Sequence, residues 1–137
     1  PPADGAAVWL LPEEDATRRA RERAKHQALH TILGPEGFAR YAAMVAAMER
    51  CTAPVVPAGS WYLSILGVFP EQQGRGIGAA LLRPTIAEAD ACQAPCYLET
   101  FGERTLPFYR RAGFVPVAAP QEPLTGARYW VLCRRPE

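Results

Sequence analysis

The sequence FPEQQGRGIGAALL occupies residues 69–82 and places Gly74, Gly76 and Gly78 at every second position. Glycine is unfavourable within a helix or a strand because it loses more backbone freedom on folding than any other residue. An apolar run typical of a strand precedes this stretch, and an apolar pattern typical of a helix follows it. Three glycines at the start of a helix therefore indicate a loop where a ligand comes close to the backbone.

The residues between these glycines favour an anion as that ligand. The first N–H groups of a helix have no partner within it, and they carry a partial positive charge. A helix start opened by glycines is consequently a typical phosphate site. Arg75 adds a permanent positive charge, and Gln73 adds a side-chain amide. We therefore expect the stretch to bind a phosphate rather than to serve only as a tight turn.

Two phosphate-containing ligands fit the glycine spacing. The letters GRGIGA, residues 74–79, satisfy the dinucleotide pattern G-x-G-x-x-G/A, and Glu99 follows at about the distance at which that pattern places an acid. However, the letters PEQQ separate Phe69 from the first glycine, whereas the glycine of that pattern should follow its strand at once. The chain of 137 residues is also short for a complete dinucleotide domain. The alternative ligand is the pyrophosphate of coenzyme A.

Strand-like and helix-like patterns alternate along the chain, which predicts an α/β fold with some helices crossing over between parallel strands. The letters GPEG, residues 34–37, divide the first helical region into two helices, and Pro84 should kink the third helix or lie in its first turns. We expect residues 1–137 to form a single domain. The expected strands are 5–12, 60–69, 95–101, 114–118 and 127–135, and the expected helices are 13–33, 38–51, 77–91 and 103–113.

Charge and composition limit the classes of partner. The formal net charge of +1 argues against a nucleic-acid-binding protein, and no apolar stretch approaches the ~20 residues of a membrane span. The four cysteines lack a C-x-x-C spacing, which favours reduced thiols in a cytoplasmic protein. His26 and His30 have the spacing of a zinc pair, but Gln27 stands where a glutamate would be needed, so we expect packing rather than metal binding.

The glycine stretch and a second segment together resemble one protein family. VFPEQQGRGIGAALL, residues 68–82, resembles the acetyl-CoA motif of the GCN5-related N-acetyltransferases (GNAT), Q/R-x-x-G-x-G/A, with Gln73, Gly76 and Gly78 at its fixed positions. LPFYRRAGF, residues 106–114, resembles the second motif of that family, in which a tyrosine follows an aromatic residue and precedes Gly-Phe. The order of segments is most similar to the branch of the family that contains puromycin N-acetyltransferase.

The resemblance implies a fold and a cofactor. The expected fold is a GNAT-like mixed sheet whose central parallel strands, 60–69 and 95–101, splay apart and are flanked by helices. It is expected to be N-terminally incomplete, because the first strand and helices of the family have no match here, and the exposed sheet edge would favour a homodimer. The expected cofactor is acetyl-CoA. The residues expected to bind it are Leu66, Val68 and Phe69 through their backbone, Gln73, Gly74, Arg75, Gly76, Ile77, Gly78 and Ala79 around the diphosphate, and Thr105.

The implied reaction is acyl transfer from acetyl-CoA to an amine. Tyr109 falls on the tyrosine position of the family and is the expected proton donor to the departing thiolate. Glu99 is the candidate base, since alternation in PCYLETF places it on one strand face with Tyr97 and Phe101, and a surface or structural role for this carboxylate is the alternative. Thr105 replaces an asparagine that the family often carries, so its contact to the cofactor should be weaker or lost.

The main hypothesis is an acetyl-CoA-dependent N-acetyltransferase that acts on the primary amine of a small molecule. Two alternatives remain open. Thr105 and the missing N-terminal elements fit a regulatory module that binds acetyl-CoA without catalysis, and the GRGIGA pattern fits a dinucleotide-binding protein. The acceptor amine is not identified by the sequence, because function resides in the acceptor pocket rather than in the fold.

Overall fold

The computed structural model describes residues 3–137, and each range expected to form a helix or a strand contains one. The boundaries move by up to three residues; the last strand, for example, begins at Trp130 rather than at residue 127. The elements are β1 (Gly5–Leu10), α1 (Asp15–Thr52), β2 (Trp61–Val68), the 3₁₀ turn η1 (Pro70–Gln72), α2 (Ile77–Ala91), β3 (Cys96–Thr100), the 3₁₀ turn η2 (Glu103–Thr105), α3 (Leu106–Arg111), β4 (Val115–Ala118) and β5 (Trp130–Arg134).

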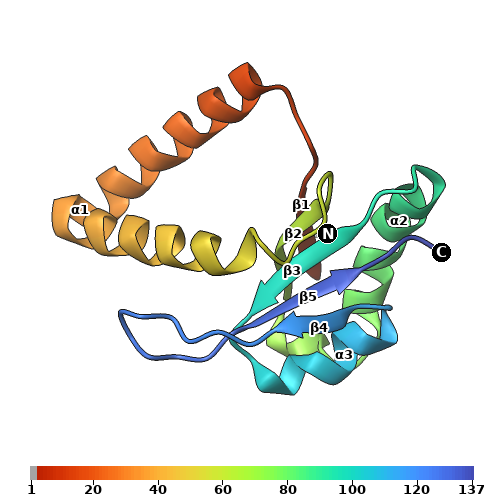
Figure 1. Ribbon diagram of the computed structural model, residues 1–137. Helices are drawn as coiled ribbons and strands as arrows, with labels where there is room; N and C mark the ends of the chain where they lie inside the picture. Colours follow the sequence, from red (N-terminus) through yellow and green to blue (C-terminus); the bar gives the residue numbers. More distant parts are fainter. Residues whose placement is uncertain (1–2) are drawn as a thin grey trace.

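The strands form one five-stranded sheet in the order β1-β2-β3-β5-β4. Strands β2 and β3 are parallel, and the other neighbouring pairs are antiparallel, so the expected mixed sheet is confirmed. Helix α1 lies on one side of this sheet, and α2 and α3 lie on the other (Figure 1). The outer edge of β1 pairs with no other strand within residues 3–137, and the homodimer expected from such an edge stays a prediction.

The two parallel strands part soon after they meet. Hydrogen-bonded pairing between them is confined to two residue pairs, although β2 continues to Val68 and β3 to Thr100. The expected splay of the central strands is therefore confirmed. The two pairs are Trp61 with Cys96 and Tyr62 with Tyr97, at the beginning of both strands.

A β-bulge in β2 lies at the point where this strand leaves β3. Along β1 the register shifts between Val8 and Trp9, which pair with Ile65 and Leu63, so Ser64 is the extra residue of β2. A bulge bends its strand and increases the local twist. The bend directs the second half of β2 away from β3 and opens the sheet on that side.

Helix α1 consists of two halves joined at Gly34, whose backbone has φ 71° and ψ 173°. The expected break is confirmed, but the second half begins at Pro35 rather than at Phe38, because proline is well suited to the first turn of a helix. The ring of Phe38 contacts His26 and His30 at centroid distances of 5.4 and 5.5 Å. These two histidines therefore pack the halves of α1 against each other.

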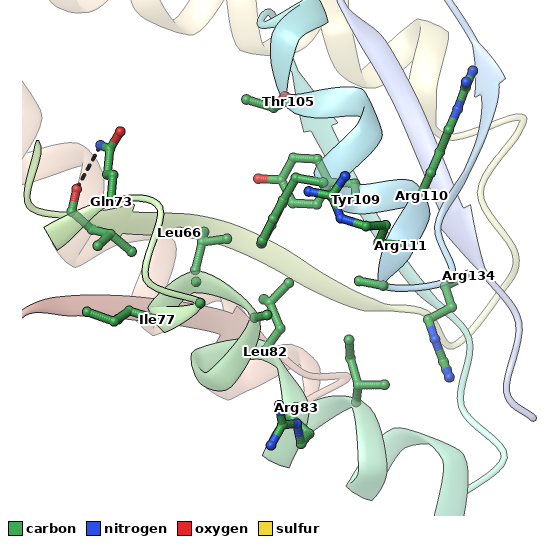
Figure 2. A pocket seen from close by; sticks show the side chains of 18 of the residues that line it. Leu66, Gln73, Ile77, Leu82, Arg83, Thr105, Tyr109, Arg110, Arg111 and Arg134 are labelled. Carbon is green, nitrogen blue, oxygen red and sulfur yellow. Dashed lines mark hydrogen bonds between the residues drawn. The ribbon is translucent and has the colours of Figure 1, made fainter.

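The loop between β2 and α2 is tied back to the end of the strand. Gln73 Nε2 donates a hydrogen bond to the carbonyl oxygen of Val68 at 3.0 Å (Figure 2). Helix α2 then begins at Ile77, as expected, with Gly76 as its N-cap. Pro84 lies inside the helix, past its first turn. The loop thus has a fixed path from strand to helix.

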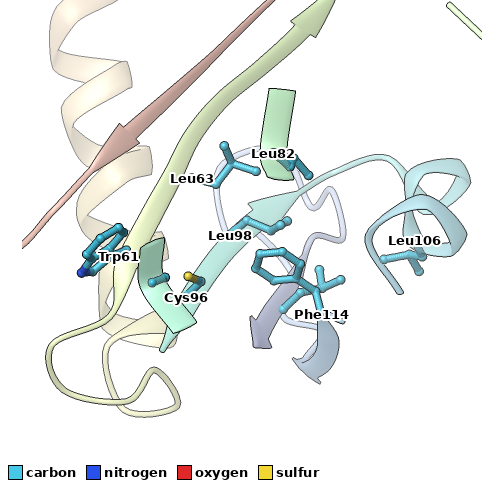
Figure 3. Packing of buried hydrophobic residues seen from close by; sticks show 9 residues of the cluster. Trp61, Leu63, Leu82, Cys96, Leu98, Leu106 and Phe114 are labelled. Atoms are coloured by element: carbon cyan, nitrogen blue, oxygen red, sulfur yellow. The ribbon is translucent and has the colours of Figure 1, made fainter. Parts of the chain in front are cut away.

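A hydrophobic core fills the space between the sheet and the two helices α2 and α3 (Figure 3). Leu82 and Ala89 of α2 are almost fully buried against Cys96 and Leu98 of β3. Burying a leucine side chain stabilises a fold by about 1.5–3 kcal/mol, so these contacts hold α2 firmly against the sheet. The buried members of the core are Trp61, Leu63, Leu82, Ala89, Cys96, Leu98, Leu106, Phe114 and Leu132.

A buried ion pair fastens the end of α2 to β5. Arg134 is 4% exposed, and its two terminal nitrogens donate to the two carboxylate oxygens of Asp90 at 2.5 and 2.9 Å. These hydrogen bonds from Arg134 lower the pKa of Asp90 below its ordinary value, and the backbone N–H of Glu137 contributes as well. A bidentate pair of this kind fixes both orientation and distance.

Replacing Asp90 by Asn is expected to lower the free energy of unfolding by about 2 kcal/mol, because the buried Arg134 would lose its counter-charge. Since the folded protein lowers the pKa of Asp90, this stabilisation is present above about pH 4, the ordinary carboxyl value, and is lost as the pH falls further. Urea unfolding at neutral and acidic pH measures both effects. The exposed Glu88→Gln variant in the same helix is the control, and equal stabilities of the Asn variant and the wild type at neutral pH would contradict the expectation.

The connection between β4 and β5 contains a second buried carboxylate, Glu122, which is 0% exposed. It accepts hydrogen bonds from the backbone N–H groups of Leu124 and Thr125, both at 2.8 Å, and from the Thr125 hydroxyl. These bonds lower the pKa of Glu122. The local turn that they stabilise, residues 122–126, lies just before the residues expected to begin the last strand.

Candidate active site

A cleft of about 930 Å³ runs along the face of the sheet that carries α2 and α3 (Figure 2). It begins at the end of β2, passes the glycine loop and the first half of α2, and continues along α3 to Arg134. Most of the residues expected to bind the cofactor line this cleft, but Phe69 and Arg75 do not. Those that do are Leu66, Val68, Gln73, Gly74, Gly76, Ile77, Gly78, Ala79 and Thr105.

The glycine loop presents an uninterrupted row of backbone N–H groups. Within residues 3–137 the N–H groups of residues 74–79 have no hydrogen-bond partner, and the first paired one, that of Ala80, donates to the Gly76 carbonyl at 3.0 Å. Gly74 and Gly76 have φ angles of 77° and 80°, which non-glycine residues rarely adopt. A Cβ atom at either position would meet no atom within 4 Å, so both glycines border open space.

Such a row fits the diphosphate that the sequence predicts. Unpaired N–H groups at a helix start form a site for anions, and the helix dipole adds to their attraction. Gly78 has a different role, since a Cβ atom there would lie 3.3 Å from the ring of Phe108. Helix α2 and α3 therefore approach each other closely at Gly78, next to the proposed diphosphate site.

The side chains of Gln73 and Arg75 are both engaged locally. Gln73 donates to Val68, as described above, and Arg75 Nη1 donates to Gln72 Oε1 at 2.9 Å. Arg75 is exposed and lies outside the lining of the cleft. Its charge still lies at the same loop as the row of N–H groups, so its predicted role is long-range attraction of an anion rather than a close contact.

Tyr109 occupies the middle of the cleft. Its half-buried ring contacts Phe108 and Phe114 at centroid distances of 5.1 and 6.2 Å, and Figure 2 shows its hydroxyl directed into the cleft. Burial raises the pKa of Tyr109 above its ordinary value of 10.0. The phenol therefore keeps its proton at neutral pH and can donate it.

Thr105 also lines the cleft, but its hydroxyl is already in use. Thr105 Oγ1 donates to the carbonyl oxygen of Gly102 at 2.6 Å and lies 3.0 Å from Thr100 Oγ1. These contacts hold the turn that leads into α3. The expectation that Thr105 contributes less to cofactor binding than an asparagine would stays a prediction, and the engaged hydroxyl is consistent with it.

Glu99 lies on the other face of β3, under α1. Its carboxylate accepts hydrogen bonds from the hydroxyl of Thr52, at the end of α1, and from that of Tyr62, at 3.3 Å. It does not line the cleft that contains Tyr109. The structure thus places the two expected catalytic residues on opposite faces of the sheet, beside the region where β2 and β3 part.

A second cavity, of about 610 Å³, lies on this other face between the two halves of α1 and the first strands of the sheet. Tyr41 of α1, Tyr62 of β2 and Tyr97 of β3 line it. No local pattern in the sequence indicates a function for these three residues. Alternation along the strands places Tyr62 and Tyr97 on a common side, but no local pattern tells which helix covers that side.

No group of three or more histidine, cysteine, aspartate and glutamate side chains in residues 3–137 is placed to hold a metal ion. Among the same residues, no helix combines the length and the apolar character that crossing a membrane requires.

A family model and several solved structures match this chain. A family model described as "Acetyltransferase (GNAT) domain" matches residues 32–116, which is more than half of the chain. A protein from Agrobacterium tumefaciens described as an acetyltransferase is 26% identical, with a TM-score of 0.50, over 57% of this chain and 58% of that one. A structure from Corynebacterium glutamicum, described as histone acetyltransferase HPA2 and related acetyltransferase, is 30% identical, with a TM-score of 0.51, over 59% of this chain and 44% of that one.

A third solved structure shows the same fold at lower identity. The ribosomal-protein-S18-alanine N-acetyltransferase from Escherichia coli is 21% identical, with a TM-score of 0.50, over 58% of this chain and 56% of that one. The chain therefore matches less than two thirds of the length of each of these three proteins.

Proposed function

The chain belongs to the GNAT acetyltransferase family, and we propose on this basis that it transfers an acetyl group from acetyl-CoA to the primary amine of a small molecule. The observation that carries the proposal is the row of unpaired N–H groups from Gly74 to Ala79, which opens into a cleft that also contains Tyr109. The family model supports acetyl transfer in general. The class of acceptor is our inference.

The cofactor would be held by backbone groups along β2 and the loop. Beyond Tyr62, the edge of β2 that faces β3 pairs with no strand of the described chain, so the backbone of Leu66 is placed to pair with the pantetheine arm. The Val68 carbonyl already accepts from Gln73, and the N–H and carbonyl groups of Phe69 are bonded to Asp4 and Gln72, so the arm would have to displace these bonds to pair there. The N–H groups of residues 74–79 would hold the diphosphate. When bound, acetyl-CoA supplies an acetyl group activated as a thioester.

Two residues of the chain would move protons in this reaction. Tyr109 keeps its proton at neutral pH and would donate it to the sulfur of the departing thiol. Glu99 would accept the proton that the amine must lose before it can attack, with the hydroxyl of Tyr62 orienting the carboxylate. The two groups lie on opposite faces of the sheet. Glu99 would therefore take the proton of the amine on one side, while Tyr109 would give a proton to the sulfur on the other.

A small molecule is the favoured acceptor because the cavity beside Glu99 has the size of a small-molecule site, which is typically about 300–1,000 Å³. Residues from both halves of α1 and from three strands line this cavity, which gives it the concave form of a small-molecule site. The similar Escherichia coli protein is described as an N-acetyltransferase of a ribosomal protein, so the acceptor class that we propose differs from that one.

Titration calorimetry with acetyl-CoA and, separately, with NAD(H) tests the cofactor. We expect acetyl-CoA to bind and NAD(H) to give no binding heat. A thiol-release assay with a panel of amines on the same protein then tests catalysis. Binding of acetyl-CoA without thiol release for any amine would favour the regulatory module, and binding of NAD(H) alone would favour the dinucleotide-binding protein.

A further inference from the structure

Three arginines that line the cleft along α2 and α3 have no partner within residues 3–137. They are Arg83 of α2 and Arg110 and Arg111 of α3, and their side chains form no hydrogen bond or ion pair there. All three are exposed, so a ligand in the cleft can reach them. The fourth arginine of the lining, Arg134, differs from them because it is buried and paired with Asp90.

The charges of the residues that line this cleft do not balance. Among the described residues of the lining the only acidic one is Glu137, and its carboxylate lies 3.8 Å from Arg134. Arg134 thus has two carboxylates near it, whereas the three unpaired arginines have none within hydrogen-bond or ion-pair distance in the described chain. A cleft lined by one sign of charge concentrates ligands of the opposite sign. The cleft therefore favours an anionic group in addition to the one that the glycine loop would bind.

Arg83 and Arg111 lie one helical turn beyond the glycine loop, on the two helices that wall the cleft (Figure 2). Arg83 follows Ala79, the last residue of the row of N–H groups, by four residues, so it lies on the same face of α2 and about 6 Å further along the axis. Arg111 follows Phe108 by three residues and shares its face of α3. These two faces meet where a Cβ atom at Gly78 would lie 3.3 Å from the ring of Phe108. The two arginines therefore flank the cleft beside the proposed diphosphate site.

Coenzyme A carries a third phosphate, a monoester on the 3′ oxygen of its ribose. This ribose is also the sugar to which the diphosphate is attached, so the 3′-phosphate must lie close to the diphosphate. We infer that Arg83 and Arg111 bind the 3′-phosphate of acetyl-CoA, and that the protein thereby selects against acyl donors that lack it. The inference rests on the proposed acetyl transfer. Guanidinium groups suit this task because their forked N–H groups match the geometry of phosphate oxygens.

Equilibrium binding of acetyl-CoA and of acetyl-dephospho-CoA tests the inference, since the two thioesters differ only in the 3′-phosphate. We expect calorimetry to give about tenfold tighter binding of acetyl-CoA, as for a charge-assisted contact at an exposed site. Arg83→Gln and Arg111→Gln should each reduce this preference, and the double variant should reduce it to about twofold or less with little change in the affinity for acetyl-dephospho-CoA. Arg104→Gln, which removes an exposed arginine outside the lining of the cleft, should keep the preference.

Failure of this inference is distinguishable from failure of the proposed function. Equal affinity for the two thioesters, a preference that survives the double variant, or an equal loss in Arg104→Gln would overturn the inference, while bound acetyl-CoA would leave acetyl transfer standing. Absence of binding for both thioesters would defeat both. A preference that only the cleft variants lose would support the inference, even if no amine gives thiol release and the regulatory module is favoured. A thermal melt of each variant checks that these exposed substitutions leave the fold intact.

Discussion

Replacing Tyr109 by Phe is expected to lower the turnover number about hundredfold, with little change in the affinity for acetyl-CoA. The ring lines the cleft and would remain in place, whereas the hydroxyl directed into the cleft would be lost. Because burial raises the pKa of Tyr109, the wild-type residue is protonated across the neutral range and can act as an acid there. Steady-state thiol release gives the turnover number, and calorimetry gives the affinity.

A matched substitution elsewhere in the chain controls for the loss of a tyrosine hydroxyl. Tyr129 is almost fully buried, lines neither cavity, and its hydroxyl donates to the carbonyl oxygen of Met48 at 3.3 Å. Tyr129→Phe removes the same atom and should reduce stability slightly without changing turnover. An unchanged turnover number in the Tyr109 variant would remove this residue from the chemistry.

Replacing Gly76 by Asp is expected to weaken acetyl-CoA binding about hundredfold, because a negative charge would stand beside the diphosphate. Gly76 has a φ angle of 80° and borders open space, so a side chain there would meet no atom and would stand within the loop that carries the row of N–H groups. Aspartate and asparagine tolerate this backbone region better than other side chains, which keeps the cost to folding small. Calorimetry with acetyl-CoA measures the effect.

Gly76→Asn is the matched control for this substitution. Asparagine has the same shape as aspartate without its charge, so it should weaken binding only several-fold. The difference between the two variants then reports the repulsion of the diphosphate. Equal affinities of the two variants for acetyl-CoA would show that no anion lies near Gly76. That result would contradict the proposal that this loop binds the diphosphate.

The parts of the fold that depend on neighbouring residues were predictable from the sequence. Helix α2 begins and ends where the apolar pattern and the glycine loop place it, Ile77–Ala91, because the start signal and the periodicity lie in the same short segment. The break in α1 was also predictable, since Gly34 adopts a positive φ angle. Its position relative to Pro35 was missed by a few residues, as expected when glycine and proline signals overlap.

The environment of Glu99 could not be predicted in the same way. Alternation correctly separated Glu99 and Tyr97 from the buried Cys96 and Leu98. Its hydrogen bond to Thr52, however, joins residues 47 positions apart, and no local pattern records that α1 folds over this face. The cavity lined by Tyr41 and Tyr62 was missed for the same reason, because it exists only after α1 has packed.

The beginning of the last strand was predicted three residues too early, for a different reason. The letters ARYWVLCRR have a continuous strand pattern from Ala127, but the observed strand starts at Trp130. Residues 127–129 pair instead with the segment just before the turn: Gln121 and Arg128 form an isolated antiparallel bridge, and the N–H of Tyr129 donates to the carbonyl oxygen of Pro120 at 3.0 Å. The buried carboxylate of Glu122 stabilises the turn between these two segments, and a glutamate is usually taken for a surface group.

The opening between β2 and β3 divides the two binding tasks among different stretches of the polypeptide. Cofactor recognition would depend on residues 66–83 and 105–111, whereas selection of the amine would depend on the hairpin of residues 15–52 and a few tyrosines. Because the two cavities share no lining residue within the described chain, substitutions in the hairpin can change which amine is accepted and leave the glycine loop unchanged. A chain built in this way can change its acceptor amine during evolution while the residues that bind the acetyl donor stay the same.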